Sequence, residues 1–176
     1  MSSILKIGMA QISPVWLNKE KTIEKVNSYI VKAAKEECDL VVFGEGLLPG
    51  YPFWLSITNG SEFNSPVQKE IHAHYLKNSI EVEKGDLNSV CKTAKENSIA
   101  IYLGIIERAV NRGGHSLYCS LVYIDKTGTI QSHPVACKFK RLGTIKRIKL
   151  VLNINSSILY QEFFKFLRFV LILPNN

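Results

Sequence analysis

A short apolar run that ends at an isolated acid is the feature that most constrains this chain. Leu40–Phe43 reads LVVF and is followed at once by Gly44-Glu45-Gly46. Four consecutive apolar residues bounded by turn signals predict a buried strand. Glu45 therefore stands where a central strand ends, a place where a carboxylate is rarely buried unless it is paired or functional.

The residues after Glu45 predict one wall of a pocket. The flanking glycines leave room for another group to approach the carboxylate, Pro49-Gly50-Tyr51-Pro52 predicts a sharp turn, and Phe53-Trp54 adds aromatic surface. A strand end, an isolated acid, a rigid loop and aromatic side chains together are typical of the edge of an active-site pocket. A helix cap or a solvated loop acid is the alternative interpretation, and the residue types alone leave both open.

The rest of the chain predicts one α/β domain. We expect strands over 4–12, 40–43, 99–106 and 117–124, and helices over 19–36, 65–77 and 86–97. Asn18 is the predicted N-cap of the first helix. Strands that alternate with helices predict a sheet with helices packed on it, and 176 residues with 46% hydrophobic content suffice for one such core.

Four segments in chain order carry a resemblance to a known family. LVVFGEGLLPGYP at 40–52 resembles the first-glutamate signature of the nitrilase superfamily, the carbon–nitrogen hydrolases. Residues 6–11 resemble the family's first strand, which ends in Ala-Gln, residues 102–108 resemble its Gly-hydrophobic-hydrophobic-Glu-Arg strand, and residues 117–125 resemble the strand before its Gly-containing turn. The likeness covers residues 4–132, and the motifs around Tyr51 and Glu107 are more similar to the nitrilase branch than to the amidase branches.

The resemblance implies a fold and a chemistry. The fold is a nitrilase-like α-β-β-α sandwich, of which this chain would hold only the N-terminal portion. Family members hydrolyse nitriles or amides with a Glu general base, a Lys and a Cys nucleophile and need no cofactor. A thiol is weakly ionised near neutral pH, so a base must take its proton, and a cation must hold the charge that develops in the reaction. Glu45 matches the general base residue for residue.

The matching lysine is not identified. In the family a His-Arg-Lys-Leu-x-Pro-Thr segment follows the fourth strand, but Pro134 and Val135 stand after His133 at the Arg and Lys positions. Lys138 and Lys140 are displaced by three to five residues, which disfavours either as the catalytic lysine because a strand alternates its faces with a period of two.

The matching cysteine is not identified either. The Cys-Trp-Glu segment of the family is absent from these 176 residues. Cys38 lies at the junction of a predicted helix and strand, Cys91 in a predicted helix and Cys119 in a predicted strand, and a free Cys is commonly a small buried hydrophobe. Cys137 is the least disfavoured substitute. We therefore expect no turnover by this chain on its own.

Further pocket residues are suggested by the same resemblance. Tyr51 and Trp54 follow the signature glutamate, Glu107 continues the third predicted strand, and His115 lies in a Gly-rich loop. An ion pair with Arg108 is the alternative for Glu107, and a solvated loop position is the preferred interpretation of His115. No Cys or His spacing predicts a metal site.

Charge divides the chain into two regions. Residues 1–134 hold 14 basic and 14 acidic residues, whereas residues 135–176 hold 8 basic residues and the single acid Glu162. We interpret 1–134 as the N-terminal part of the hydrolase domain and 135–176 as a basic, apolar tail that does not match the family. One hypothesis is that the tail is out-of-frame or intron-derived; an amphipathic helix over 158–173 is the structural alternative.

These features define the expected partners. The first expectation is a small nitrile or amide substrate, a cytoplasmic homo-oligomer, no nucleic acid and no membrane-spanning segment. One alternative is a non-catalytic, truncated subunit that associates with full-length homologues. The other is a basic module that binds membranes or nucleic acid through its tail.

Overall fold

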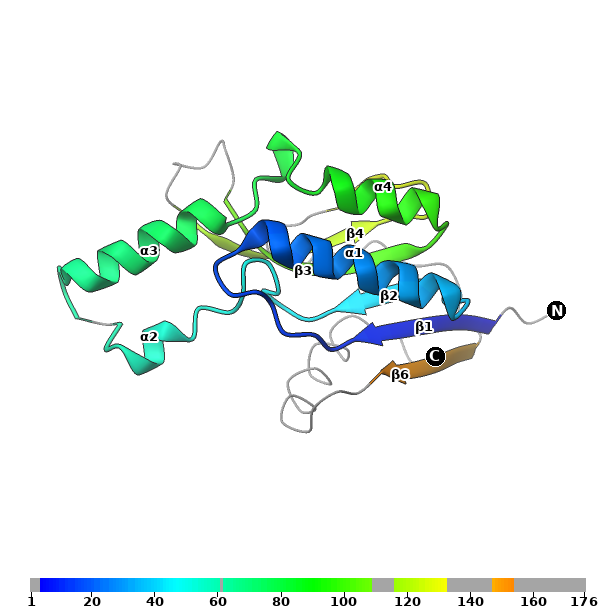
Figure 1. The fold of residues 1–176 in the computed structure, drawn as a ribbon, viewed down its shortest axis with the longest axis horizontal. Coiled ribbons are helices and arrows are strands. Elements are labelled where there is room, and N and C mark those ends of the chain that lie inside the picture. The colour runs from blue at the N-terminus through cyan, green and yellow to red at the C-terminus, as the bar shows by residue number, and fades with distance from the viewer. Residues whose placement is uncertain (1–3, 61, 109–115, 133–146, 154–176) are drawn as a thin grey trace, which may run out of the picture.

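The computed structural model describes residues 4–60, 62–108, 116–132 and 147–153, and for Ile4, Ser132 and residues 147–153 it describes the backbone only (Figure 1). In chain order the elements are β1 (Ile4–Ala10), α1 (Lys19–Lys35), β2 (Leu40–Phe43), α2 (Trp54–Ile57), α3 (Pro66–Asn78), the 3-10 turn η1 (Val82–Lys84), α4 (Asn88–Glu96), β3 (Ala100–Glu107), β4 (Tyr118–Ile124), β5 (Ile130–Ser132) and β6 (Arg147–Asn153). The described part of the chain is therefore an α/β structure, as the sequence predicts.

The described strands form a single sheet with β2 near its middle. The strand order is β5-β4-β3-β2-β1-β6. β1 pairs in parallel with β2 and β6, β2 pairs in parallel with β3, and β4 runs antiparallel to both β3 and β5. Because parallel strands end at the same edge of a sheet, the chain that leaves β2 emerges beside the ends of β1 and β3.

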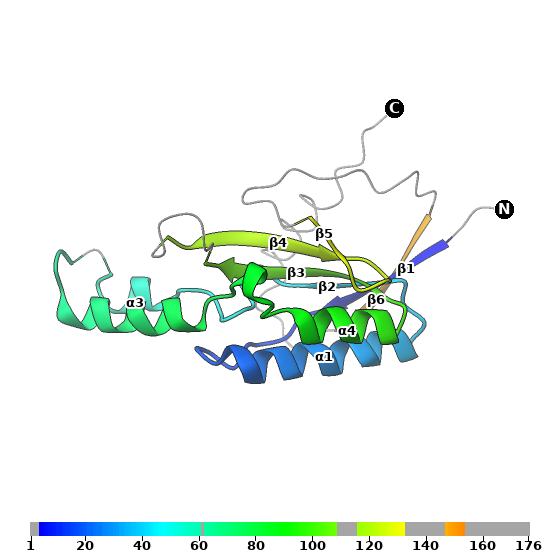
Figure 2. The same cartoon turned by 90° about the horizontal axis from the view of Figure 1, so that it is seen from above.

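Two helices cover one face of this sheet. Figure 2 shows α1 and α4 side by side on the same side of the strands. Val26 and Ile30 of α1 and Val90 of α4 are completely buried, in a cluster that also holds Phe43 and Leu103 from the sheet. Burying an aliphatic side chain contributes about 1.5–3 kcal/mol, so this helix-covered face carries the main core. All four residues of β2 are buried, as the apolar run predicts.

The opposite face carries a smaller apolar cluster, and we call it the open face because no described helix covers it (Figure 2). Its buried members are Ile7, Leu40, Val42, Ala100 and Tyr102. The Tyr102 ring lies 4.8 Å from the ring of Tyr123 on β4. Burial, with a smaller contribution from Tyr123, raises the pKa of Tyr102 to about 12.

The predicted elements are confirmed, with shifts at their ends. Asn18 caps α1 through its side-chain oxygen, which accepts a hydrogen bond from the Lys21 backbone N at 2.9 Å. The helix predicted from Asp86 begins at Asn88 instead, because the Asp86 carboxylate pairs with Lys19 at 2.8 Å and accepts from the Glu81 backbone N at 2.9 Å.

Four elements were not expected from the sequence: α2, η1, β5 and β6. β6 pairs with β1 over its whole length, from Ile4 opposite Arg147 to Ala10 opposite Asn153. Seven residues of the basic tail thus belong to the sheet, whereas the region predicted as an amphipathic helix, 158–173, lies outside the described residues. Within the described residues, no helix is long and apolar enough to span a membrane.

Candidate active site

The chain bulges away from the sheet directly after β2. Val42 pairs with Tyr102, and the next pairing joins Leu48 to Ile105 in the same parallel direction. The chain thus advances six positions while β3 advances three, so residues 44–47 form a bulge. The Ile106 backbone N donates to the Leu48 carbonyl oxygen at 2.7 Å and closes the bulge. Glu45 lies within it, beyond the regular end of the central strand.

The Glu45 carboxylate contacts a thiol on a neighbouring strand. Its side chain is exposed, and Oε1 accepts a hydrogen bond from Cys119 Sγ at 3.1 Å. Cys119 lies on β4 directly opposite Ile106 of β3 and is itself exposed. Among the described residues, Cys119 is the only side chain that binds this carboxylate, and no lysine or arginine pairs with it. The alternative of a helix cap for Glu45 is excluded because Glu45 precedes no helix.

The bulge and Cys119 share the open face of the sheet. A Cβ built on Gly104 meets the bulge backbone, whereas the adjacent residues Leu103 and Ile105 point into the helix-covered core. Alternate residues of a strand point to opposite faces, and residues directly opposite each other on paired strands share a face. Gly104, Ile106 and Cys119 therefore all face away from α1 and α4.

Glu107 lies on the other face. Its side chain is 1% exposed, and its Oε2 accepts a hydrogen bond from Ser120 Oγ at 2.6 Å. Ser120 follows Cys119 on β4, so the two point to opposite faces of the sheet. The structure therefore places Glu107 on the helix-covered face and Glu45 on the open face, although the family resemblance suggested both as pocket residues and both lie near the same edge of the sheet. The face that Glu45 occupies could not be predicted by counting alternate residues along β2, because the bulge breaks the register between β2 and β3.

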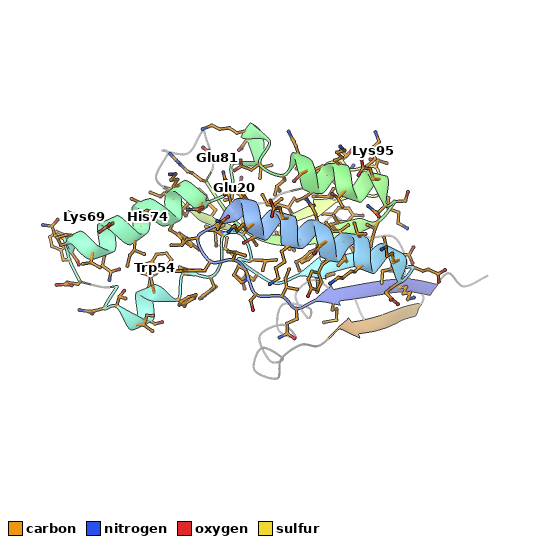
Figure 3. The ribbon with its side chains drawn as sticks, in the orientation of Figure 1. Glu20, Trp54, Lys69, His74, Glu81 and Lys95 are labelled. Carbon is orange, nitrogen blue, oxygen red and sulfur yellow. The ribbon has the colours of Figure 1, made fainter. Side chains whose placement is uncertain are left out.

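The two predicted aromatic residues are placed differently from each other. Tyr51 is 63% exposed, whereas Trp54 is 3% exposed and packs at 4.5 Å against Tyr75, between ring centroids. Figure 3 marks Trp54 at the start of α2, on the side toward α3. Trp54 is thus a buried packing residue between α2 and α3 and not an exposed pocket wall. Within the described residues its indole N has no hydrogen-bond partner.

Tyr75 is a site-supporting residue that the sequence reasoning missed. Its hydroxyl donates to the Gly50 carbonyl oxygen at 2.7 Å, which ties α3 to the turn after Glu45. Burial raises the pKa of Tyr75 well above its usual value, with smaller contributions from the nearby Cys119 and Tyr51. The spacing of Ile71 and Tyr75, four residues apart on one helix face, was the available signal, and both belong to the cluster around Trp54.

The remaining candidates lie outside the described residues. These are His115 between β3 and β4, His133 after β5, and Cys137, Lys138 and Lys140 in the tail. Within the described residues, no group of three His, Cys, Asp or Glu side chains is arranged to hold a metal ion.

Comparison with known proteins identifies the family. The family model for carbon–nitrogen hydrolases matches residues 6–158, so the chain belongs to the carbon–nitrogen hydrolase family. Among curated relatives, it is 36% identical over 128 residues to an arylacetonitrilase of Aspergillus oryzae, an alignment that covers 73% of this chain and 35% of that protein. It is 30% identical over 125 residues to a protein named nitrilase 2 from an unknown prokaryotic organism, covering 70% of this chain and 38% of that protein.

The solved structures agree on the fold. An amidase from Nesterenkonia sp. superposes with a TM-score of 0.50 at 13% identity, covering 85% of this chain and 48% of that one. The C. elegans NitFhit protein superposes with a TM-score of 0.50 at 14% identity, covering 85% and 32%. The described structure thus has the nitrilase-type fold that the resemblance implied.

The extent of these matches bears on the activity and on the tail. The chain spans about 35–38% of the length of the curated relatives it matches, so the activity of such whole proteins enters here only as a proposal. The family match continues to residue 158, beyond the boundary after residue 134 that charge predicts, and that boundary stays a prediction.

Proposed function

We propose that this chain carries the general base of a nitrilase-type hydrolase, with Glu45 in that role and a nitrile or amide as substrate. The observation that carries the proposal is the hydrogen bond between Glu45 Oε1 and a thiol at 3.1 Å. A general base needs a proton donor within about 2.6–3.2 Å, and the exposed carboxylate meets this condition at the edge where the central strands end. The relatives named arylacetonitrilases favour an arylacetonitrile as the substrate class.

The proposed chemistry is thiol addition. The base takes the proton of a thiol, the sulfur forms a bond to the nitrile carbon, and the nitrile nitrogen receives the proton, which gives a thioimidate with no leaving group. One structure of the Nesterenkonia amidase is described as a covalent addition of an acetamide moiety at its active-site cysteine. That description concerns the amidase alone, and it supports a thiol as the nucleophile in this fold.

We further propose that the 176 residues alone do not complete the reaction. Cys119 is within hydrogen-bond reach of Glu45. Among the described residues, however, no lysine or arginine forms an ion pair with Glu45, and the reaction also needs a cation at this site to hold the charge that develops on the substrate. We therefore interpret Cys119 as a residue that lines the approach to Glu45, with the nucleophile and lysine supplied by segments like those of the family. The purified chain should release no ammonia from phenylacetonitrile or phenylacetamide, and hydrolysis that requires a cysteine of this chain would refute this interpretation.

A chimera tests the role of Glu45 directly. Residues 1–132 of this chain would replace the matching third of the Aspergillus oryzae arylacetonitrilase, to which the chain is 36% identical over 128 residues. We expect the chimera to hydrolyse phenylacetonitrile and Glu45→Gln to lower kcat by about 10²–10⁴-fold. Glu24→Gln is the matched control because Glu24 is an exposed acid on α1, which covers the opposite face of the sheet (Figure 2). Full activity with Glu45→Gln would overturn the proposal.

Association with other copies of a family member is a second proposal, favoured by one surface. Large apolar side chains are exposed along 51–67: Tyr51, Phe53, Leu55, Ile57, Phe63 and Val67. Exposed large apolar side chains gathered in one segment are typical of an interaction site. Sedimentation of the chain alone and mixed with a full-length homologue distinguishes self-association, mixed association and a monomer; a monomer in both experiments would contradict the proposal. The absence of nucleic-acid binding and the cytoplasmic location stay predictions.

A further inference from the structure

The bulge that carries Glu45 rests on one residue of β3, Gly104. A Cβ added at Gly104 would lie 2.4 Å from the Gly44 carbonyl oxygen and 2.6 Å from Glu45 Cα. Real Cβ atoms essentially never approach other heavy atoms more closely than 3.0 Å. Any side chain at this position would therefore force either β3 or the bulge to move.

The strand is held more firmly than the bulge. β3 pairs with β2 on one side and with β4 over seven residue pairs on the other. The residues on either side of Gly104, Leu103 and Ile105, are completely buried in the helix-covered core. Glu45 is exposed and belongs to no strand. Leu47, at the other end of the bulge, is buried in the same core, so a collision at residue 104 would displace the Gly44-Glu45 segment.

We propose that Gly104 is a positioning residue for Glu45: its lack of a side chain lets the Gly44-Glu45 backbone lie across β3, so that the carboxylate reaches the open face beside β4. The catalytic meaning of this position rests on the function proposed above. The placement itself does not, because it follows from the contacts of Gly104 and from the hydrogen bond between Glu45 and Cys119.

Gly44, in the bulge itself, offers a matched control. Gly44 is adjacent to Glu45, yet a Cβ built there meets nothing within 4 Å. Its φ lies outside the left-handed region, so alanine at this position is not strained. Gly44→Ala and Gly104→Ala are the same chemical change at two ends of one contact, and only the second creates a collision.

The Cys119 thiol reports the position of the carboxylate without any substrate. Thiolate is the form that alkylating agents attack, and a negative charge hydrogen-bonded to the thiol opposes thiolate formation. Removing the charge with Glu45→Gln should accelerate alkylation of Cys119 by iodoacetamide about three- to tenfold near pH 8, equivalent to about half to one pH unit along the profile. Moving the charge away should have the same effect.

The experiment measures alkylation of Cys119 by peptide mass spectrometry from pH 6 to 10 in the 176-residue chain. We expect Gly104→Ala to shift the profile in the same direction as Glu45→Gln, Gly44→Ala to leave it unchanged, and Gly104→Ala combined with Glu45→Gln to add nothing to Glu45→Gln alone. A parental profile in Gly104→Ala, or a further shift in the double variant, would overturn the proposal.

Cys38 serves as the internal control for folding. It is 8% exposed and lies in the helix-covered core, so it should stay protected while the fold is intact. Rapid alkylation of Cys38 in Gly104→Ala would show that Gly104 supports the whole sheet, and would equally overturn a positioning role. Because no substrate is present, these outcomes are independent of whether the chimera hydrolyses nitriles.

Discussion

The two acids near the end of the central strands, Glu45 and Glu107, lie on opposite faces of the sheet and differ in exposure and in hydrogen-bond partner. Glu45 is exposed on the open face and contacts a thiol, whereas Glu107 is buried on the helix-covered face and contacts a hydroxyl. Their partners, Cys119 and Ser120, are consecutive residues of β4. A shift of one residue along a strand thus separates a carboxylate that is accessible for chemistry from one that is built into the core.

The largest expected effect distinguishes the two faces by activity. In the chimera, Glu45→Gln should lower kcat for phenylacetonitrile by about 10²–10⁴-fold, because general-base catalysis contributes a factor of that order. Glu107→Gln keeps the size of the side chain and one acceptor oxygen, so we expect less than about a tenfold change, arising from stability. Steady-state kinetics on both variants checks this, and a larger loss in Glu107→Gln would reverse the assignment.

Stability should show the opposite order. Glu107→Ala removes a buried side chain and leaves the Ser120 hydroxyl without its acceptor, so the free energy of unfolding should fall by about 2–4 kcal/mol. Glu45→Ala should change it by less than about 0.5 kcal/mol because the side chain is exposed. Urea unfolding followed by circular dichroism measures both values. Equal losses would mean that the open face also depends on its acid for folding.

Tyr102 gives the open face a pH dependence of its own. Its pKa is raised to about 12 in the fold, chiefly by burial, against about 10 in the unfolded chain. The neutral form is therefore favoured in the native state, and this contribution is fully present below pH 10 and lost as the pH rises from 10 toward 12. We expect the free energy of unfolding to fall by up to about 2 kcal/mol across this window.

Tyr102→Phe removes the titrating hydroxyl and tests the source of that pH dependence. The variant should show a flatter stability profile between pH 10 and 12 than the parent chain. An unaltered slope in Tyr102→Phe would assign the effect to other groups, such as Tyr75, whose pKa burial also raises.

The sequence predicts the open-face acid better than its surroundings. The apolar run Leu40–Phe43 and the glycines after it correctly place Glu45 beyond a buried central strand. The bulge depends on where Leu48 rejoins β3, a long-range pairing that local residue patterns do not encode. The same limit explains why Cys119 was interpreted as an ordinary strand residue and why a pocket position and an ion pair both stayed open for Glu107.

Other elements were missed because they are too short or depend on distant partners. β5 has three residues and α2 has four, lengths at which hydrophobic periodicity carries no signal. β6 forms only by pairing with β1, more than a hundred positions earlier in the chain. Tyr75 gained its role through the Gly50 carbonyl oxygen on another loop.

The smallest expected effect isolates the hydrogen bond on the helix-covered face. Ser120→Ala removes the hydroxyl that donates to Glu107 Oε2 at 2.6 Å and leaves the carboxylate in place. A hydrogen bond to a charged group contributes about 1.5–3 kcal/mol, so we expect a loss near the lower end, smaller than that of Glu107→Ala. Cys119→Ala, one residue earlier on the exposed face, is the matched control and should cost less than about 0.5 kcal/mol. If Ser120→Ala and Cys119→Ala lower the free energy of unfolding equally, the two faces differ in exposure alone. The hydrogen bond between Ser120 and Glu107 would then not stabilise the pairing of β3 with β4.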